Sequence, residues 1–305
     1  MSRGASRPTP GAARRVLFLF FAVFVGVAGY WYCSRRAGRP RETLPAVTPP
    51  PAKTPATASA RPGLRPPGLP PDFESAGPVA RGLIAVVVDD VGYEEGALPR
   101  LARIEAPLAL SVLPGTPHAA QAAALARRKG WDLMVHLPME PESGKAERGS
   151  IGAADDGASI RARVSAAIDA IPGATGLNNH QGSKATADPR VMRDVLTVVK
   201  ARGLFFLDSR TTPATAGERL AQEMKVPVLA RDVFLDDAAT EASDPAGGPG
   251  ALEGAWDRAL AHAAKNGRCV VIAHPHPESV EFLLKQLPAL GSHGLRAIRV
   301  AELLD

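Results

Sequence analysis

The chain has 305 residues, of which 45% are hydrophobic and 22% are charged, an ordinary composition for one or two globular domains. Its two cysteines exclude a disulfide-stapled fold and a Cys-rich zinc finger, since either needs at least about four. Residues 1–80 carry a net charge of +8, whereas residues 81–305 carry a net charge of −3. The mildly acidic balance of the larger part argues against nucleic-acid binding, which needs a basic surface.

The first apolar stretch spans residues 16–33 and reads VLFLFFAVFVGVAGYWYC, without a single charge. Its length approaches the roughly 20 residues that cross a bilayer as a helix. Arginines flank it on both sides, and Trp31 and Tyr32 lie at its far edge, as interfacial aromatics do. We expect an uncleaved anchor with residues 1–15 in the cytoplasm; a cleaved signal peptide is the alternative, although no small-x-small site closes the stretch.

The segment that follows, residues 34–80, is expected to be a linker. Twelve of the 29 prolines lie in residues 37–80, interleaved with Ala, Thr and Arg and without helical or strand periodicity. Proline favours extended polyproline II, so the segment is predicted to act as a semi-rigid spacer. It would hold a domain at 81–305 away from the inner membrane, on the periplasmic side.

From residue 83 onward, short apolar runs alternate with amphipathic stretches. Strands are predicted at 83–88, 108–113, 132–137, 175–179, 203–208, 226–230, 269–274 and 296–300. Helices are predicted at 118–130, 161–171, 189–203, 218–225, 252–267 and 279–294, several of them ending in a glycine C-cap. Strands that are apolar on both faces indicate a parallel sheet covered by helices, and seven or eight such units favour a (β/α) barrel. An open doubly wound sheet is the alternative fold.

Chemistry in a parallel α/β fold gathers at the carboxyl ends of the strands. Several predicted strands deliver a carboxylate or an imidazole there: Asp89, Asp90, His136, His180, Asp208 and His274. Two imidazoles and a carboxylate could hold a catalytic divalent metal with one position open for water. The competing interpretations are a helix cap for the aspartate pair, a core histidine at 136, a loop cap at 208 and a proline-stiffened loop at 274–277.

Five segments in order resemble the divergent polysaccharide deacetylases: DDVG (89–92), VHLPME (135–140), GLNNHQGSKAT (176–186), FFLDSRT (205–211) and IAHPHP (272–277). The resemblance covers about residues 82–304 and implies a distorted (β/α) barrel of about seven strands with a divalent metal, usually zinc. Carried over by motif, it makes Asp89 the general base, Asp90 a metal ligand and His274 the general acid.

The match to the family's pattern departs at two places. The active enzymes have two histidines one turn apart after the third strand, whereas this chain has only His136 there, with Glu140 four residues on. His180 would supply the second imidazole ligand from another strand. GSKAT stands where active enzymes carry an arginine-containing loop that steadies the base. Whether Glu140, Asp208 or His276 joins the site stays open at this point.

The expected function is metal-dependent hydrolysis of N-acetyl groups on an envelope polysaccharide, with a glycan such as peptidoglycan as partner. The alternative is a catalytically inactive glycan-binding or scaffolding protein of the cell envelope, motivated by the two departures from the family pattern. A metal-dependent phosphoesterase shares the Asp and His chemistry and is a weaker alternative. No P-loop, GxGxxG, GxSxG or HExxH motif is present to favour other enzyme classes.

Overall fold

The computed structural model describes residues 80–236 and 250–304. In chain order the first elements are β1 (Gly82–Val91), α2 (Ala97–Leu101), β2 (Ala109–Val112), α3 (Ala119–Lys129), β3 (Asp132–Met139), α4 (Gly157–Asp169), β4 (Gly176–Gln181), α5 (Pro189–Ala201) and β5 (Phe205–Asp208). The remaining elements are α6 (Gly217–Glu223), β6 (Val228–Ala230), β7 (Val233–Phe234), α7 (Ala251–Asn266), β8 (Arg268–Ala273), α8 (Pro277–Gln286), η1 (Leu287–His293), β9 (Leu295–Ala297) and η2 (Val300–Leu303).

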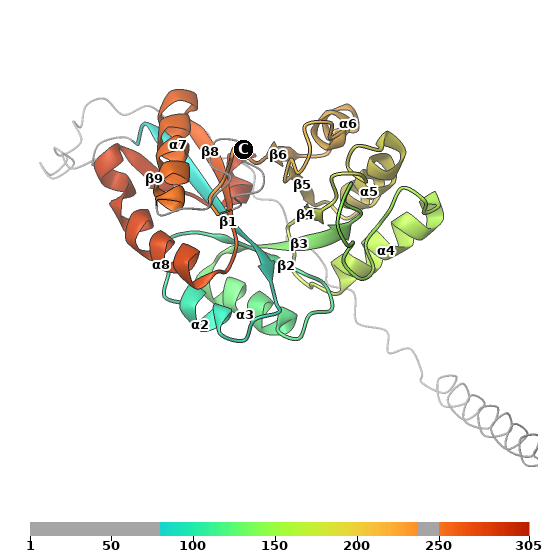
Figure 1. Cartoon of the computed structure of the whole chain (residues 1–305), viewed down its shortest axis with the longest axis horizontal. Helices are drawn as coiled ribbons and strands as arrows, with labels where there is room; N and C mark the ends of the chain where they lie inside the picture. Colours follow the sequence, from blue (N-terminus) through green and yellow to red (C-terminus); the bar gives the residue numbers. More distant parts are fainter. Residues whose placement is uncertain (1–79, 237–249, 305) are drawn as a thin grey trace, which may run out of the picture. The chain divides into compact units, whose positions relative to one another are not determined.

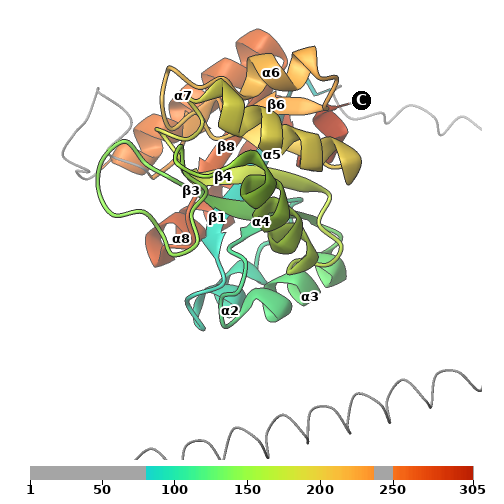
Figure 2. The same ribbon diagram turned by 90° about the vertical axis from the view of Figure 1, so that its right-hand side faces the viewer.

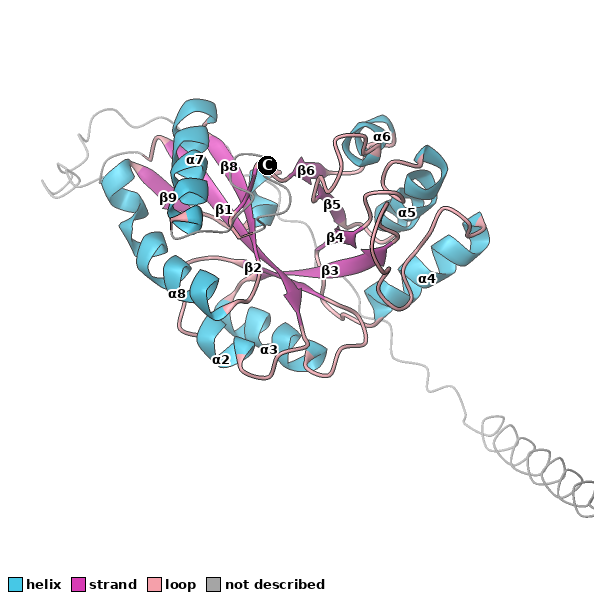
Figure 3. Cartoon of the chain, viewed as in Figure 1, coloured by secondary structure: helices cyan, strands magenta, loops and turns pink. Residues whose placement is uncertain are grey.

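The strands form one parallel sheet in the order β6-β5-β4-β3-β2-β1-β8-β7, and β9 pairs with β1 beside this path. Figures 1 and 3 show the helices arranged around the outer side of this curved sheet. Within the described residues no hydrogen-bonded ladder joins the end strands β6 and β7; the short segment Arg231–Asp232 links them instead. The result is a parallel α/β half-barrel of eight strands, so the α/β class is confirmed and the expected barrel is only partly closed.

The sheet separates two apolar cores, and the alternation of side chains along each strand decides which core a residue joins. Along β1, Ile84, Val86 and Val88 pack toward the helices, whereas Ala85 and Val87 pack inside the half-barrel. The inner core consists of Ala85, Val87, Ala109, Met134, Phe205, Leu207, Leu229, Phe234, Val270, Ile272, Ile298, Val300 and Leu303. Polar side chains at the carboxyl ends of the strands that also point inward therefore lie together above this core.

All eight strands expected from the sequence are present, although the last, expected at 296–300, is only β9 (Leu295–Ala297) and is followed by the unpredicted η2. Three further elements differ from expectation. The two-residue β7 and the single-turn α2 were not predicted, because both are too short to show a period. The helix expected over 279–294 ends at Gln286 and continues as the 3₁₀ helix η1. Pro288 has no N–H to donate and clashes with the preceding turn, which explains the change.

Glycine is required inside the half-barrel at Gly176, the first residue of β4. A Cβ at this position would lie 2.4 Å from the ring of Phe205 on the neighbouring strand. Figure 2 shows β4 in the middle of the fold, and the strand pairs with β3 on one side and β5 on the other. The close approach lets the large Phe205 ring fill the inner core directly below the strand end that carries Asn178 and His180.

The expected anchor at 16–33, the linker at 34–80 and the cytoplasmic segment at 1–15 lie outside the described residues. In the ranges that are described, none of the helices has the length and apolar character needed to cross a bilayer.

Candidate metal centre

Asp90, His136 and His180 bring three ligand atoms within 4.8 Å of one another at the carboxyl edge of the sheet. The Oδ1 atom of Asp90 lies 3.0 Å from Nε2 of His136 and 2.8 Å from Nδ1 of His180. The two imidazole nitrogens are themselves 3.2 Å apart. The structure thus brings together, from β1, β3 and β4, the three residues that the sequence analysis nominated as metal ligands.

The strand alternation explains why the two histidines converge. His136 has the same parity as inner-core Met134 on β3, and it pairs in register with Asn178 of β4. His180 follows Asn178 by two residues on the same face and pairs in register with Pro138. Both imidazoles therefore point into the half-barrel above the inner core.

Asp90 reaches this cluster by a different route. By alternation it would point away from the inner face that Asp89 occupies, but its φ of 55° is left-handed. The pairing of β1 with β2 also shifts register between Val88 and Val91. This strained turn carries the Asp90 carboxylate back over the strand end beside Asp89, and such strain is often found where function requires it.

Asn178 orients both His136 and Asp89. Its Nδ2 donates to the two carboxylate oxygens of Asp89 at 2.9 and 3.0 Å, so its Oδ1 is the acceptor for Nδ1–H of His136 at 2.8 Å. Ser111 donates a further hydrogen bond to that Oδ1 at 2.5 Å. With Nδ1 protonated, Nε2 of His136 keeps its lone pair and faces Asp90, the tautomer that a metal ligand needs.

The donor set fits a divalent cation. Oδ1 of Asp90 is buried and has no hydrogen bond of acceptable geometry, although two imidazole nitrogens lie within 3.0 Å of it. One carboxylate and two imidazoles are the ligand types that zinc prefers, and three protein ligands leave a position for water or substrate. Burial alone would raise the pKa of Asp90, but the neighbouring imidazoles of His136 and His180 hold that pKa well below its usual range.

Asp89 lies next to the cluster without being part of it. The residue is 2% exposed, and its Oδ2 is 3.7 Å from Nε2 of His136. Burial raises the pKa of Asp89, and the charges of His136 and His274 together with the Asn178 hydrogen bond oppose that rise. A cation at the cluster would add a further opposing charge and favour the ionised form of Asp89.

His274 approaches the cluster from β8, with its Nε2 4.0 Å from Oδ2 of Asp90. Its Nδ1 donates to Oδ1 of Asp236 at 2.8 Å, and its backbone N–H donates to Oδ2 of the same carboxylate. Ser279 donates to Asp236 as well. Burial lowers the pKa of His274, but the hydrogen bond and charge of Asp236, with the charges of Asp89 and Asp90, raise it to about 9.

Asp236 and Asn178 are the site residues that the sequence analysis did not assign. Asp236 follows Phe234, an inner-core residue of β7, by two positions, and so continues the inward alternation of a strand too short to be predicted. Asn178 lies inside a quoted motif, two residues before His180. Both residues lie an even number of positions from inward-facing strand residues. In the sequence this spacing, and not the residue type, indicates that they face the site.

The three residues whose part in the site the sequence analysis left undecided all lie outside the cluster of Asp90, His136 and His180. The Asp208 carboxylate accepts hydrogen bonds from Arg210 N, Thr215 Oγ1 and Glu218 N, and therefore holds the β5–α6 loop. Glu140 pairs with Lys184 at the rim. His276 is the N-cap residue of α8, with its ring centroid 5.8 Å from that of His274.

This parallel half-barrel with a carboxylate and two imidazoles at its carboxyl edge has a deacetylase-like fold. The family model of the divergent polysaccharide deacetylases matches residues 86–304. The chain belongs to this family.

Two bacterial proteins are similar to this chain over about two thirds of its length. The chain is 34% identical over 216 residues to a Haemophilus influenzae protein described as uncharacterised, covering 68% of this chain and 73% of the relative. It is 34% identical over 207 residues to the uncharacterised Escherichia coli protein YibQ, covering 68% of this chain but only 62% of that protein. The fold is also similar to a solved structure of an uncharacterised Agrobacterium tumefaciens protein, with a TM-score of 0.66 and 22% identity over 73% of this chain and 89% of the other.

Proposed function

We propose that the protein is a metal-dependent hydrolase that removes N-acetyl groups from an envelope polysaccharide. The observation that carries this proposal is the convergence of the ligand atoms of Asp90, His136 and His180 between a buried carboxylate, Asp89, and an imidazole, His274. Amide hydrolysis needs a base, an electrophile and an acid around one carbonyl, and this arrangement offers a residue or ligand set for each role.

Asp90, His136 and His180 would hold the cation. When bound there, a divalent cation would lower the pKa of water and stabilise the negative charge that develops on the acetamide oxygen. Asp89 would accept the proton of the attacking water at its carboxylate. Nδ2 of Asn178 donates to both oxygens of that carboxylate and would steady it, the role that an arginine-containing loop has in the active enzymes of the resembled family.

His274 would deliver the proton to the departing amine nitrogen from Nε2. Its Nδ1–H is held by Asp236, so Nε2 is the atom that faces Asp90 and the cluster. A pKa of about 9 keeps the imidazole protonated at neutral pH, as an acid in this position requires. Asp89 and His274 thus have environments suited to opposite directions of proton transfer.

Asp236→Asn is expected to move the alkaline limb of the pH–rate profile to lower pH by roughly one to two units. Activity requires protonated His274 and falls as pH rises through its pKa of about 9; losing the Asp236 charge lowers that pKa. The profile of kcat/KM against pH measures the shift. Asp232→Asn is the matched control, because Asp232 lies on the same segment but contacts Val270 and His262 instead. An unchanged limb in Asp236→Asn would remove His274 from the acid role.

Acetate release from chitooligosaccharides and from peptidoglycan, measured with and without added zinc, tests the function directly. We expect release that depends on the cation and that a chelator abolishes. Zinc-loaded protein that binds glycan but releases no acetate from any substrate would contradict the hydrolase and leave the glycan-binding protein. Two sequence features favour that second candidate: the single histidine of VHLPME and the GSKAT segment without an arginine.

The cellular placement is a proposal of its own: an anchor at 16–33 in the inner membrane with residues 81–305 in the periplasm. It is supported by the charge-free apolar run, its flanking arginines and the proline-rich segment that follows. Deleting residues 1–36 is then expected to give a protein that is folded and stays in solution without detergent. Circular dichroism and sedimentation check this; aggregation of the truncated chain while the full chain is folded in detergent would contradict it.

A further inference from the structure

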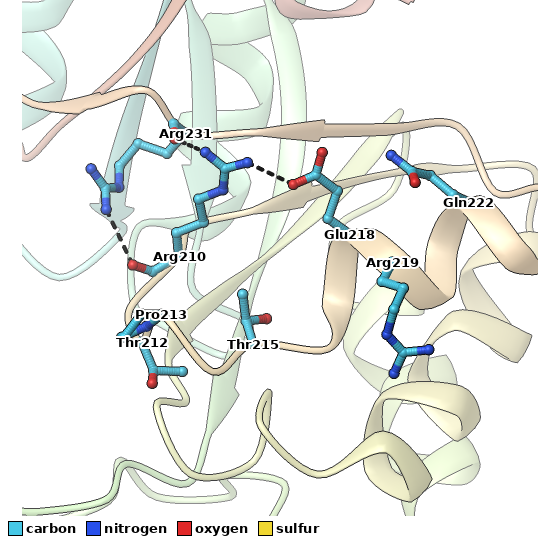
Figure 4. A pocket seen from close by; sticks show the side chains of 8 residues that line it. All are labelled: Arg210, Thr212, Pro213, Thr215, Glu218, Arg219, Gln222 and Arg231. Atoms are coloured by element: carbon cyan, nitrogen blue, oxygen red, sulfur yellow. Dashed lines mark hydrogen bonds and ion pairs between the residues drawn. The ribbon is translucent and has the colours of Figure 1, made fainter.

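A cavity of about 600 Å³ opens where the carboxyl ends of β5 and β6 meet α6 (Figure 4). None of the residues that line it belongs to the cluster of Asp90, His136 and His180. The lining residues are Arg210, Thr212, Pro213, Thr215, Glu218, Arg219, Gln222 and Arg231. It lies on the same edge of the sheet as the metal centre, because Arg210 comes two residues after the end of β5 and Arg231 comes one residue after the end of β6.

The lining is cationic. Three arginines and one carboxylate, that of Glu218, line the cavity. Arg210 Nη2 donates to Glu218 at 2.6 Å, and Arg219 pairs with Glu223, which lies outside the lining. Figure 4 shows the Arg210 guanidinium between Glu218 of α6 and the Arg231 carbonyl, to which its Nη1 donates. Hydroxyl and amide groups of Thr212, Thr215 and Gln222 complete a wall rich in hydrogen-bonding groups. Guanidinium forks in such a setting favour carboxylate and phosphate groups.

The arginines are pre-positioned. Arg231 donates through Nε to the Ser209 carbonyl and through Nη2 to the Arg210 carbonyl, which ties β6 to the β5–α6 loop. Arg210 has a left-handed φ of 49°, and its N–H is held by the buried Asp208 carboxylate. A loop that is already fixed loses less conformational entropy when it binds a ligand.

Two contacts connect the cavity to the metal centre. The Arg231 guanidinium lies 3.8 Å from the centroid of the Phe234 ring, and that ring stacks on His274 with centroids 6.2 Å apart. On the other side of the loop, Ser209, the neighbour of Arg210, accepts a hydrogen bond from Asn178 Nδ2 at 3.3 Å. The cavity wall is thus linked to the metal centre through the Phe234 ring on one side and through Ser209 on the other.

We propose that this cavity binds a carboxylate substituent of the glycan while a neighbouring N-acetylated sugar occupies the metal centre. The inference rests on the proposed function, because it takes an acetylated glycan as the ligand. It adds a selectivity for acidic glycans over neutral ones such as chitin fragments. Arg219 and Arg210 supply the charge that recognises the carboxylate, and Arg231 fixes the cavity wall against Phe234 and His274.

Calorimetric titration of the full chain tests the selectivity without requiring turnover. The probes are an N-acetylglucosamine–N-acetylmuramic acid disaccharide, the methyl ester of the same disaccharide, and N,N′-diacetylchitobiose. We expect the free acid to bind about 10-fold more tightly than its ester, the scale of a hydrogen bond to a charged group. The preference should shrink at high salt, because the cavity is open to solvent.

The variant Arg219→Gln is expected to lose most of this preference while binding the neutral probes as wild type does. Arg103→Gln is the matched control: Arg103 and Arg219 are 57% and 59% exposed and each pairs with one surface glutamate, but Arg103 lies outside the cavity. Equal binding of acid and ester by wild-type protein would overturn the inference even if acetate is released. An acid preference that Arg219→Gln abolishes would uphold the inference even if no acetate is released, so the two proposals fail separately.

Discussion

Replacing Asp89 with asparagine is expected to lower acetate release by roughly 100-fold or more, the usual scale for a removed general base. The side chain keeps its size, and the amide can still lie in the space beside Asn178, so fold and metal content should be retained. What is lost is the proton acceptor. Steady-state kinetics together with metal analysis of the same preparation measure both quantities.

The neighbouring substitution Asp90→Asn is expected to affect metal binding, in contrast to Asp89→Asn. Asp90 is adjacent in sequence, but its Oδ1 lies within 3.0 Å of both imidazole nitrogens, whereas Asp89 is 3.7 Å from His136 and is held by Asn178. We therefore expect Asp90→Asn to weaken metal binding itself, and Asp89→Asn to leave it intact. Loss of metal from Asp89→Asn with full retention by Asp90→Asn would exchange the roles of the two carboxylates.

The sequence predicted most of the fold because its strands are long enough to show their apolar faces. The runs at 83–88 and 269–274 became β1 and β8, which pair in register from Leu83 with Arg268 to Val88 with Ala273. Closure of the sheet was not predictable in the same way. It depends on β6 and β7, which have three and two residues and carry no periodic signal.

The sequence predicted the candidate metal ligands and the candidate acid, but it did not predict the residues that orient them. His136, His180 and His274 are scarce residue types at strand ends, so their positions alone drew attention to them. The roles of Asn178 and Asp236 depend instead on hydrogen bonds across 42 and 38 residues of chain. Neither contact follows from residue spacing until the strand order is known.

The left-handed turn at Asp90 is the second feature that residue type could not reveal. A strict alternation would place Asp89 inside and Asp90 outside, leaving the cluster without a carboxylate ligand. The φ of 55° at Asp90 overrides the alternation, and Gly92, with a φ of 131°, lets the chain continue past Thr116. The left-handed backbone of the DDVG segment thus places two consecutive carboxylates on one side of a strand end.

His136→Ala and His180→Ala are each expected to reduce zinc affinity by more than about 100-fold, since loss of an outer-shell partner alone costs 10- to 100-fold. Either substitution removes one of three converging ligand atoms and leaves Asp90 with a single imidazole. Competition with a chelating dye measures the affinity. Because ligands must lose their protons to bind a cation, wild-type affinity for zinc should also fall as the pH is lowered.

The two histidines differ in what else they hold. His136 is 2% exposed and hydrogen-bonded to Asn178, so its loss also frees the residue that orients Asp89. His180 is half-buried, and its replacement leaves that network in place. Glu140→Gln is the control, because Glu140 belongs to the same motif as His136 but pairs with Lys184 at the rim. Retention of one equivalent of tightly bound zinc by either alanine variant would remove that histidine from the ligand set, whereas zinc loss from Glu140→Gln would extend the site to the rim.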